Sequence, residues 1–133
     1  MGTKLSTRVM VRCFWEQARA MPGFDDALRK HPRAIEGINQ MTLHNAVFFK
    51  DFLGIDGGEL HRMRGVIDAN FERYVGESDE LRVGKYTRDA TAPKITKYLN
   101  GNGFNIDQSI VDEIIKQEFQ GLTEEPNRGA PAR

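Results

Sequence analysis

The residues of this chain best suited to chemistry are its three histidines and its one cysteine. His44 and His61 fall on two consecutive predicted helices, and Glu59 lies close to His61. Two imidazoles and a carboxylate can hold a zinc ion, but ligands on one helix need a spacing of about four residues to share a face, and these residues lack it. We interpret Cys13 as a small buried hydrophobic side chain and not as a nucleophile. These residues therefore predict no metal and no cofactor.

Two glycine-rich turns are the remaining candidates for chemistry, because backbone N–H groups at such turns can hold an anion. Gly57 and Gly58 open a predicted helix, and Gly101-Asn102-Gly103 closes another. Neither turn is followed by the Lys-Ser/Thr pair of a P-loop, and neither shows the spacing of a dinucleotide-binding motif. We expect the protein not to be an enzyme.

Basic residues recur along the first predicted helix and form a stripe on one side of it: Lys4, Arg8, Arg12 and Arg19. Residues four apart lie on the same side of a helix, so these cations could contact phosphates or an acidic partner. The alternative is an ordinary solvated face, opposite the apolar side of the same helix.

The first helix also carries more apolar side chains than one face can hold. Either the helix is central and buried, or part of it docks on another protein chain. Aromatic residues and methionine are enriched in protein interfaces. We therefore assign a protein interface to Met10, Phe14 and Trp15.

The segment 92–119 has the form of a helix-turn-helix unit, with a glycine-rich turn between two helices. The string that begins at Tyr98-Leu99, passes Gly103-Phe104 and ends at Asp107 to Val111 is similar to the DNA-binding half of arginine-repressor-type winged helices. This resemblance implies that the second helix enters the major groove. Its early residues Gln108, Ser109 and Asp112 would then lie in the groove, and the possible nucleic-acid contacts are Gln108, Ser109 and, further along, Lys116. Asp112 and Glu113 would place negative charge near the phosphates, which opposes DNA binding.

The elements that must position these residues are helices, each with a capping residue before it and a Gly or Pro stop after it. The expected ranges are 6–21, 24–31, 43–53, 57–75, 91–100 and 108–121, with a short turn at 35–41. Asp56 with Glu59 three residues later predicts a capping box, and Gly54 predicts a helix end. The fold class is therefore all-α, a compact bundle of five or six helices around a central helical hairpin (residues 42–75).

Length and composition agree with a single helical domain. The chain has 133 residues, which predicts one domain at 1–122 and a flexible, disordered polar tail at 123–133. Residues 76–90 are expected to be an exposed connector. The formal net charge is zero, although residues 1–65 carry an excess of Lys and Arg and residues 101–133 an excess of Asp and Glu. We expect no membrane span and a cytoplasmic protein, because no apolar run approaches the ~20 residues of a membrane helix.

The sequence thus predicts a non-catalytic protein-interaction or assembly module that self-associates or binds a protein partner. The alternative is a nucleic-acid-binding regulator that uses residues 92–119 together with the basic stripe. No residue identifies the partner.

Overall fold

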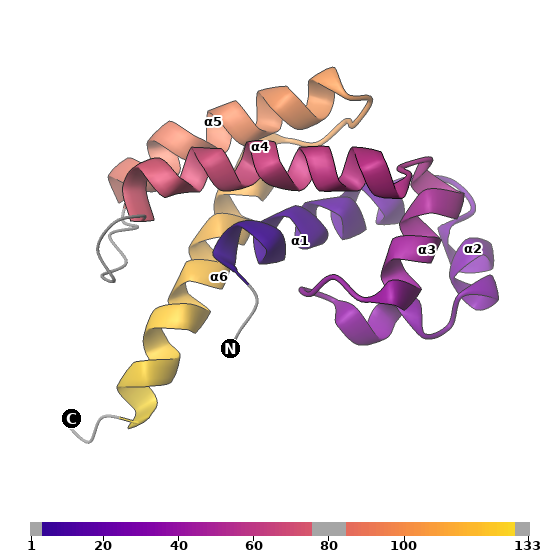
Figure 1. Ribbon diagram of the computed structural model, residues 1–133, viewed down its shortest axis with the longest axis horizontal. Coiled ribbons are helices and arrows are strands. Elements are labelled where there is room, and N and C mark those ends of the chain that lie inside the picture. The colour runs from indigo at the N-terminus through magenta and orange to yellow at the C-terminus, as the bar shows by residue number, and fades with distance from the viewer. Residues whose placement is uncertain (1–3, 76–84, 130–133) are drawn as a thin grey trace. The chain divides into compact units, whose positions relative to one another are not determined.

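The computed structural model describes the backbone of residues 4–75 and 85–129 and the side chains of residues 4–71 and 91–118 (Figure 1). These residues form helices and connections, without a strand in either range, so the all-α prediction is confirmed. The elements are α1 (Leu5–Arg19), α2 (Phe24–Lys30), the 3-10 helix η1 (Ala34–Gly37), α3 (Leu43–Leu53), α4 (Gly57–Val75), α5 (Lys85–Gly101) and α6 (Gln108–Gly129).

The chain divides into two compact units, Met1–Asp68 and Ala69–Arg133, which are called unit 1 and unit 2 below. The division falls inside α4, so that helix contributes residues to both units. Each unit is described by itself. The single domain at 1–122 and the flexible tail at 123–133 remain predictions, and residues 76–84 of the expected connector lie outside the described residues.

Unit 1 is built around an aromatic cluster between α1 and α3. The ring of Trp15 stacks on Phe48 at a centroid distance of 5.3 Å and meets Phe49 edge to face at 5.1 Å. Phe14 adds an edge-to-face contact with Phe49 at 5.2 Å, and Phe24 of α2 meets Phe48 at 6.1 Å. Such ring pairs stabilise a core beyond the area that they bury. The indole N–H of Trp15 donates to the backbone oxygen of Gly37 at 3.4 Å, so the polar end of the ring is also satisfied.

The two helices of the expected hairpin are present with the predicted boundaries, 43–53 and 57–75. Gly54 ends α3 at a φ of 75°, and its N–H donates to the Lys50 oxygen. Asp56 caps α4, because its side chain accepts from the Glu59 N–H at 2.8 Å. We expected Phe48 and Phe52 to meet apolar residues of 57–75. Among the described residues, their ring contacts outside α3 are with Trp15, Phe24 and His31, so the aromatic part of this core lies between α1, α2 and α3.

Unit 2 contains α5 and α6, which pack extensively and cross at a steep angle (Figure 1). Gly103 (φ 95°) turns the chain, and the Phe104 N–H donates back to the Leu99 oxygen at 3.1 Å, in the manner of a Schellman motif. The side-chain amide of Asn100 donates to the Ile106 oxygen and accepts from the Ile106 N–H, both at 3.0 Å. This connection is therefore held by its own hydrogen bonds.

Two helix limits in unit 2 differ from those expected. We expected Thr91 to cap the first helix and Pro93 to lie in its first turn, but α5 already begins at Lys85, so both residues lie inside it. Thr91 is fully buried, and among the described residues its hydroxyl has no hydrogen-bond partner. The second helix continues past Gly121, where we expected it to end, to Gly129. A glycine inside a helix costs only about 1 kcal/mol, so it is a weak stop signal.

Candidate functional site

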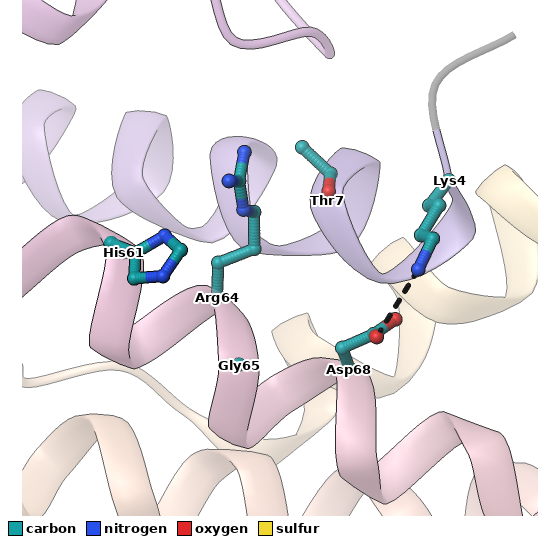
Figure 2. A pocket seen from close by; sticks show the side chains of 6 residues that line it. All are labelled: Lys4, Thr7, His61, Arg64, Gly65 and Asp68. Carbon is teal, nitrogen blue, oxygen red and sulfur yellow. Dashed lines mark hydrogen bonds and ion pairs between the residues drawn. The ribbon is translucent and has the colours of Figure 1, made fainter.

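Unit 1 contains a pocket of about 400 Å³ between the start of α1 and the middle of α4 (Figure 2). It is lined by six residues from these two helices: Lys4, Thr7, His61, Arg64, Gly65 and Asp68. The four residues from α4 follow a spacing of three, four and seven, which places them on one face of that helix. Gly65 lacks a side chain, and a Cβ at this position would meet no atom within 4 Å. The missing side chain therefore leaves open space at the pocket wall.

Asp68 binds the beginning of α1. Its carboxylate accepts from the Ser6 hydroxyl at 2.7 Å and from the Lys4 ammonium at 3.3 Å. A negative charge at this position is favourable, because the N-terminus of a helix carries a partial positive charge. Asp68 thus neutralises Lys4, and it leaves the other cationic side chain of the pocket, Arg64, without a carboxylate.

Arg64 and His61 form no hydrogen bond or ion pair with any described residue. Figure 2 shows the Arg64 side chain extending from α4 toward α1, between His61 and Thr7. Thr7 is only 6% exposed, yet its hydroxyl also has no partner in the described part of the chain. Three groups that can donate hydrogen bonds therefore meet at one pocket.

The basic stripe of the first helix is only partly available to a ligand. Lys4 pairs with Asp68, and Arg19 pairs with Glu16 at 3.3 Å. Arg8 and Arg12 are half-buried and have interactions of their own. Neither a row of free cations nor the solvated face that was the alternative describes α1 fully, because these cations are paired or half-buried.

The interface that we assigned to Met10, Phe14 and Trp15 is wrong in its location. All three side chains are at most 1% exposed, together with Val9, Val11 and Cys13 on the other sides of α1. The apolar side chains of α1 are buried, which was the other alternative, while Arg8, Arg12 and Glu16 on its remaining side are half-buried. In this structure Met10, Phe14 and Trp15 are not accessible to a partner.

Exposed apolar side chains are found on α3 instead. Leu43 is 76% exposed and Val47 is 42% exposed, one turn apart, while Phe48 and Phe49 on the opposite side are buried. We expected this helix to be buried all round, because it is apolar on nearly every side. Both faces of α3 are apolar in sequence. They differ because α1 packs against one of them and not against the other.

The residues expected to contact nucleic acid lie on α6. Gln108, Ser109 and Lys116 are all exposed. Asp112 is half-buried beside them, and the exposed Glu113 accepts a hydrogen bond from Gln117 at 2.9 Å. Residues 4–75 and 85–129 contain no strand, so the described part of the chain lacks the β-wing of a winged helix.

Among the described residues, no three His, Cys, Asp or Glu side chains come together as a metal site. His44 and His61 are both exposed. The third histidine, His31, was not singled out by its sequence context, but it links α2 to α3 through an ion pair between its Nε2 and the Asp51 carboxylate at 2.8 Å. The two residues are twenty positions apart, so only the fold brings them together.

Cys13 is fully buried, and burial raises the pKa of its thiol to about 12 from an ordinary value of 9.0. Only the thiolate reacts with disulfide reagents, so we expect no labelling of the folded protein at pH 8 and complete labelling in denaturant.

Because the pKa of the Cys13 thiol is higher in the folded state than in the unfolded state, the protonated thiol stabilises the folded state below pH 9. This contribution is lost as the pH rises from 9 toward 12. Cys13→Ala should lack this part of the alkaline decline in urea-unfolding measurements. Rapid labelling of the native protein would contradict the burial.

No protein-family model, no curated protein and no solved structure matches the chain. In the described residues, every helix is too short or too polar to cross a membrane.

Proposed function

We propose that this chain is a non-catalytic, cytoplasmic protein-interaction module that self-associates through the outer face of α3. The observation that supports the proposal is the exposure of Leu43 and Val47 on the face of α3 that points away from its own core. A leucine that is 76% exposed gains free energy when a partner covers it, by about 25 cal/mol for each Å² of apolar area.

Exposed apolar residues are concentrated in one short part of the described chain. The large hydrophobic side chains with substantial exposure are Ile35, Ile38, Leu43, Val47 and Ile110, and four of them fall within residues 35–47. Single exposed apolar side chains are normal on protein surfaces, whereas a local concentration of them is typical of an interaction site. Residues 35–47 comprise η1, the connection that follows it and the first half of α3.

The form of this apolar face favours a second copy of the same chain as the partner. Leu43 and Val47 lie one turn apart on the exposed side of α3, and Asp51 on the same helix is already paired with His31 of its own chain. If two copies of α3 pair in antiparallel orientation about a two-fold axis, the apolar face of each copy covers that of the other. An isologous dimer needs such self-complementarity.

The proposal is tested by sedimentation equilibrium over a wide range of protein concentration. We expect a reversible dimer for the wild-type chain and dimerisation about tenfold weaker or less for Leu43→Asp, since one central apolar residue often carries more than 1 kcal/mol of binding free energy. Ile110→Asp is the matched control, because it makes the same kind of change at an exposed apolar residue (37%) in unit 2. A wild-type chain that stays monomeric at millimolar concentration would contradict self-association, as would equal effects of the two substitutions.

A second candidate, a nucleic-acid-binding regulator, is supported by one observation. Gln108 and Ser109 are exposed in the first turn of α6, and the hydrogen-bonded connection after α5 holds that turn in place. Affinity for duplex DNA would have to come mainly from phosphate contacts and would fall steeply with salt. A titration with duplex DNA at low salt that shows no binding would reject this candidate.

A further inference from the structure

We propose that the pocket between α1 and α4 in unit 1 binds the phosphate group of a small molecule. This proposal is independent of the outer face of α3, because none of the residues in the pocket belongs to that helix. It concerns Thr7, His61 and Arg64 as direct contacts, with Asp68 and Lys4 at one end of the site.

Hydrogen-bond donors without partners among the described residues converge on the pocket. The Arg64 guanidinium and the His61 imidazole have no partner among the described residues, and the nearly buried Thr7 hydroxyl has none either. The Thr7 hydroxyl lines the pocket and is therefore available to a bound acceptor. A guanidinium, an imidazole and a hydroxyl together match the several acceptor oxygens of a phosphate.

The three donors also lie around one region of the pocket. Arg64 extends from α4 toward α1 and lies between His61 and Thr7, so the three side chains surround one region and do not point apart (Figure 2). Arginine is suited to this role because its planar group donates two parallel hydrogen bonds to one phosphate. The absence of a side chain at Gly65 leaves space beside them.

The size of the pocket is typical of a site for a small molecule. Small-molecule pockets in proteins have volumes of about 300 to 1,000 Å³, and this one, at about 400 Å³, falls within that range. A bare phosphate would leave much of it unfilled. The volume therefore favours a phosphomonoester, with the phosphate at Arg64 and its organic part in the remaining space.

The carboxylate of Asp68 should oppose the binding of an anion in this pocket, so its removal should strengthen binding. Its carboxylate holds Lys4 at 3.3 Å and repels a nearby anion. Removing the negative charge by Asp68→Asn frees Lys4 for the ligand and removes the repulsion, while an amide oxygen still accepts from the Ser6 hydroxyl. A loss of binding would be the expected result if Asp68 were itself a ligand-binding group.

The experiment is a titration of the folded chain with inorganic phosphate and with glycerol phosphate at constant ionic strength, followed by NMR. We expect saturable shifts of the Thr7 and Gly65 amide signals with both anions, and none with glycerol. Arg64→Gln should weaken binding about tenfold, which is typical for one charge-assisted hydrogen-bond pair. Arg62→Gln is the matched control: it removes the same charge from the same helix, but residue 62 is exposed on the opposite side.

Two further variants test phosphate binding even if Arg64→Gln affects folding. Asp68→Asn should tighten phosphate binding several-fold. Gly65→Ala should weaken it, since the new methyl group takes up space in the pocket while meeting no atom of the protein. Equal effects of Arg62→Gln and Arg64→Gln would show a general charge effect and overturn the proposal. Absence of saturable shifts in the wild-type chain would overturn it directly.

Discussion

The Trp15→Ala substitution is expected to lower the free energy of unfolding by about 4 kcal/mol, the cost typical of removing a large aromatic side chain from a core. Trp15 is 1% exposed and lies at the centre of the aromatic cluster, against Phe48 and Phe49 of α3 and Phe24 of α2. Its removal leaves a cavity that these rings cannot close without moving. Urea denaturation followed by circular dichroism measures the effect.

Two control variants distinguish the role of Trp15 in the core from a role at the surface. Trp15→Phe retains a ring and loses the hydrogen bond to the Gly37 oxygen, so it should cost clearly less than Trp15→Ala. Leu43→Ala, at a residue that is 76% exposed, should change the stability of the monomer by no more than about 0.5 kcal/mol. If Trp15→Ala cost less than Leu43→Ala, α1 would not be the core helix of unit 1.

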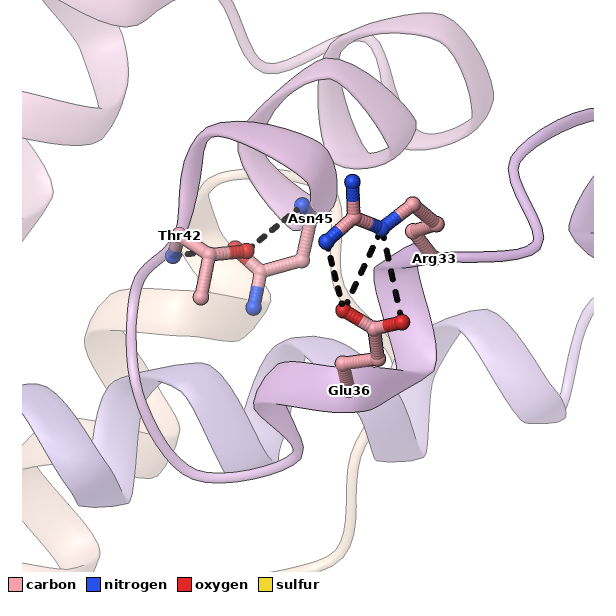
Figure 3. Close-up of polar contacts among 4 residues, drawn as sticks. All are labelled: Arg33, Glu36, Thr42 and Asn45. Carbon is pink, nitrogen blue, oxygen red and sulfur yellow. Dashed lines mark hydrogen bonds and ion pairs between the residues drawn. The ribbon is translucent and has the colours of Figure 1, made fainter.

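The Asn45→Ala substitution is expected to lower the free energy of unfolding by about 3 kcal/mol, because it removes three hydrogen bonds between a fully buried side chain and the backbone. Asn45 is fully buried. Its amide nitrogen donates to the oxygens of Gly37 and Gln40, both at 2.7 Å, and its oxygen accepts from the Thr42 N–H at 2.9 Å. Figure 3 shows the pairing between Asn45 and Thr42 at the start of α3. Thermal unfolding would show the loss as a large decrease in Tm.

The matched control for Asn45 is Thr42, which takes part in the same capping box but makes fewer contacts. Thr42→Ala removes the acceptor of the Asn45 N–H and should cost about 1 kcal/mol, the usual cost of losing a helix cap. Asn45→Ala should therefore be the more damaging change by a clear margin. Equal costs would mean that the bonds to Gly37 and Gln40 contribute little.

The helices with clear local signals could be predicted from the sequence alone. Thr42, Gly54 and Asp56 mark three helix ends, and α3 and the limits of α4 lie where these residues place them. The start of α5 could not be predicted in this way. Thr91 and Pro93 have the local pattern of a helix start, but the packed structure continues the helix through both residues. A residue such as Thr91 caps a helix only if the helix begins at that position. Tertiary packing determines where the helix begins.

The surfaces were harder to predict than the helices. Both α1 and α3 are apolar on more than one side, so the sequence does not reveal which of them exposes a face. The ring of Trp15 stacks on that of Phe48, 33 positions away. The apolar side chains of α1 are buried on several sides, while those of α3 are buried on one. The pocket between α1 and α4 joins residues 4–7 to residues 61–68. On α4 alone, the shared face of His61, Arg64 and Asp68 could have been recognised from their spacing.

The bond between Ser6 and Asp68 has a consequence for how unit 1 could be rearranged or transplanted. Unit 1 ends at Asp68, and its first described residues are Lys4 to Ser6, so a 2.7 Å hydrogen bond joins the two ends of this stretch. Segments whose ends lie side by side can be inserted into a host loop or joined by a short linker and reopened elsewhere. Asp68 lies inside α4, so any such cut at this position would also divide that helix, and the bond to Ser6 would have to hold its shortened end to the start of α1.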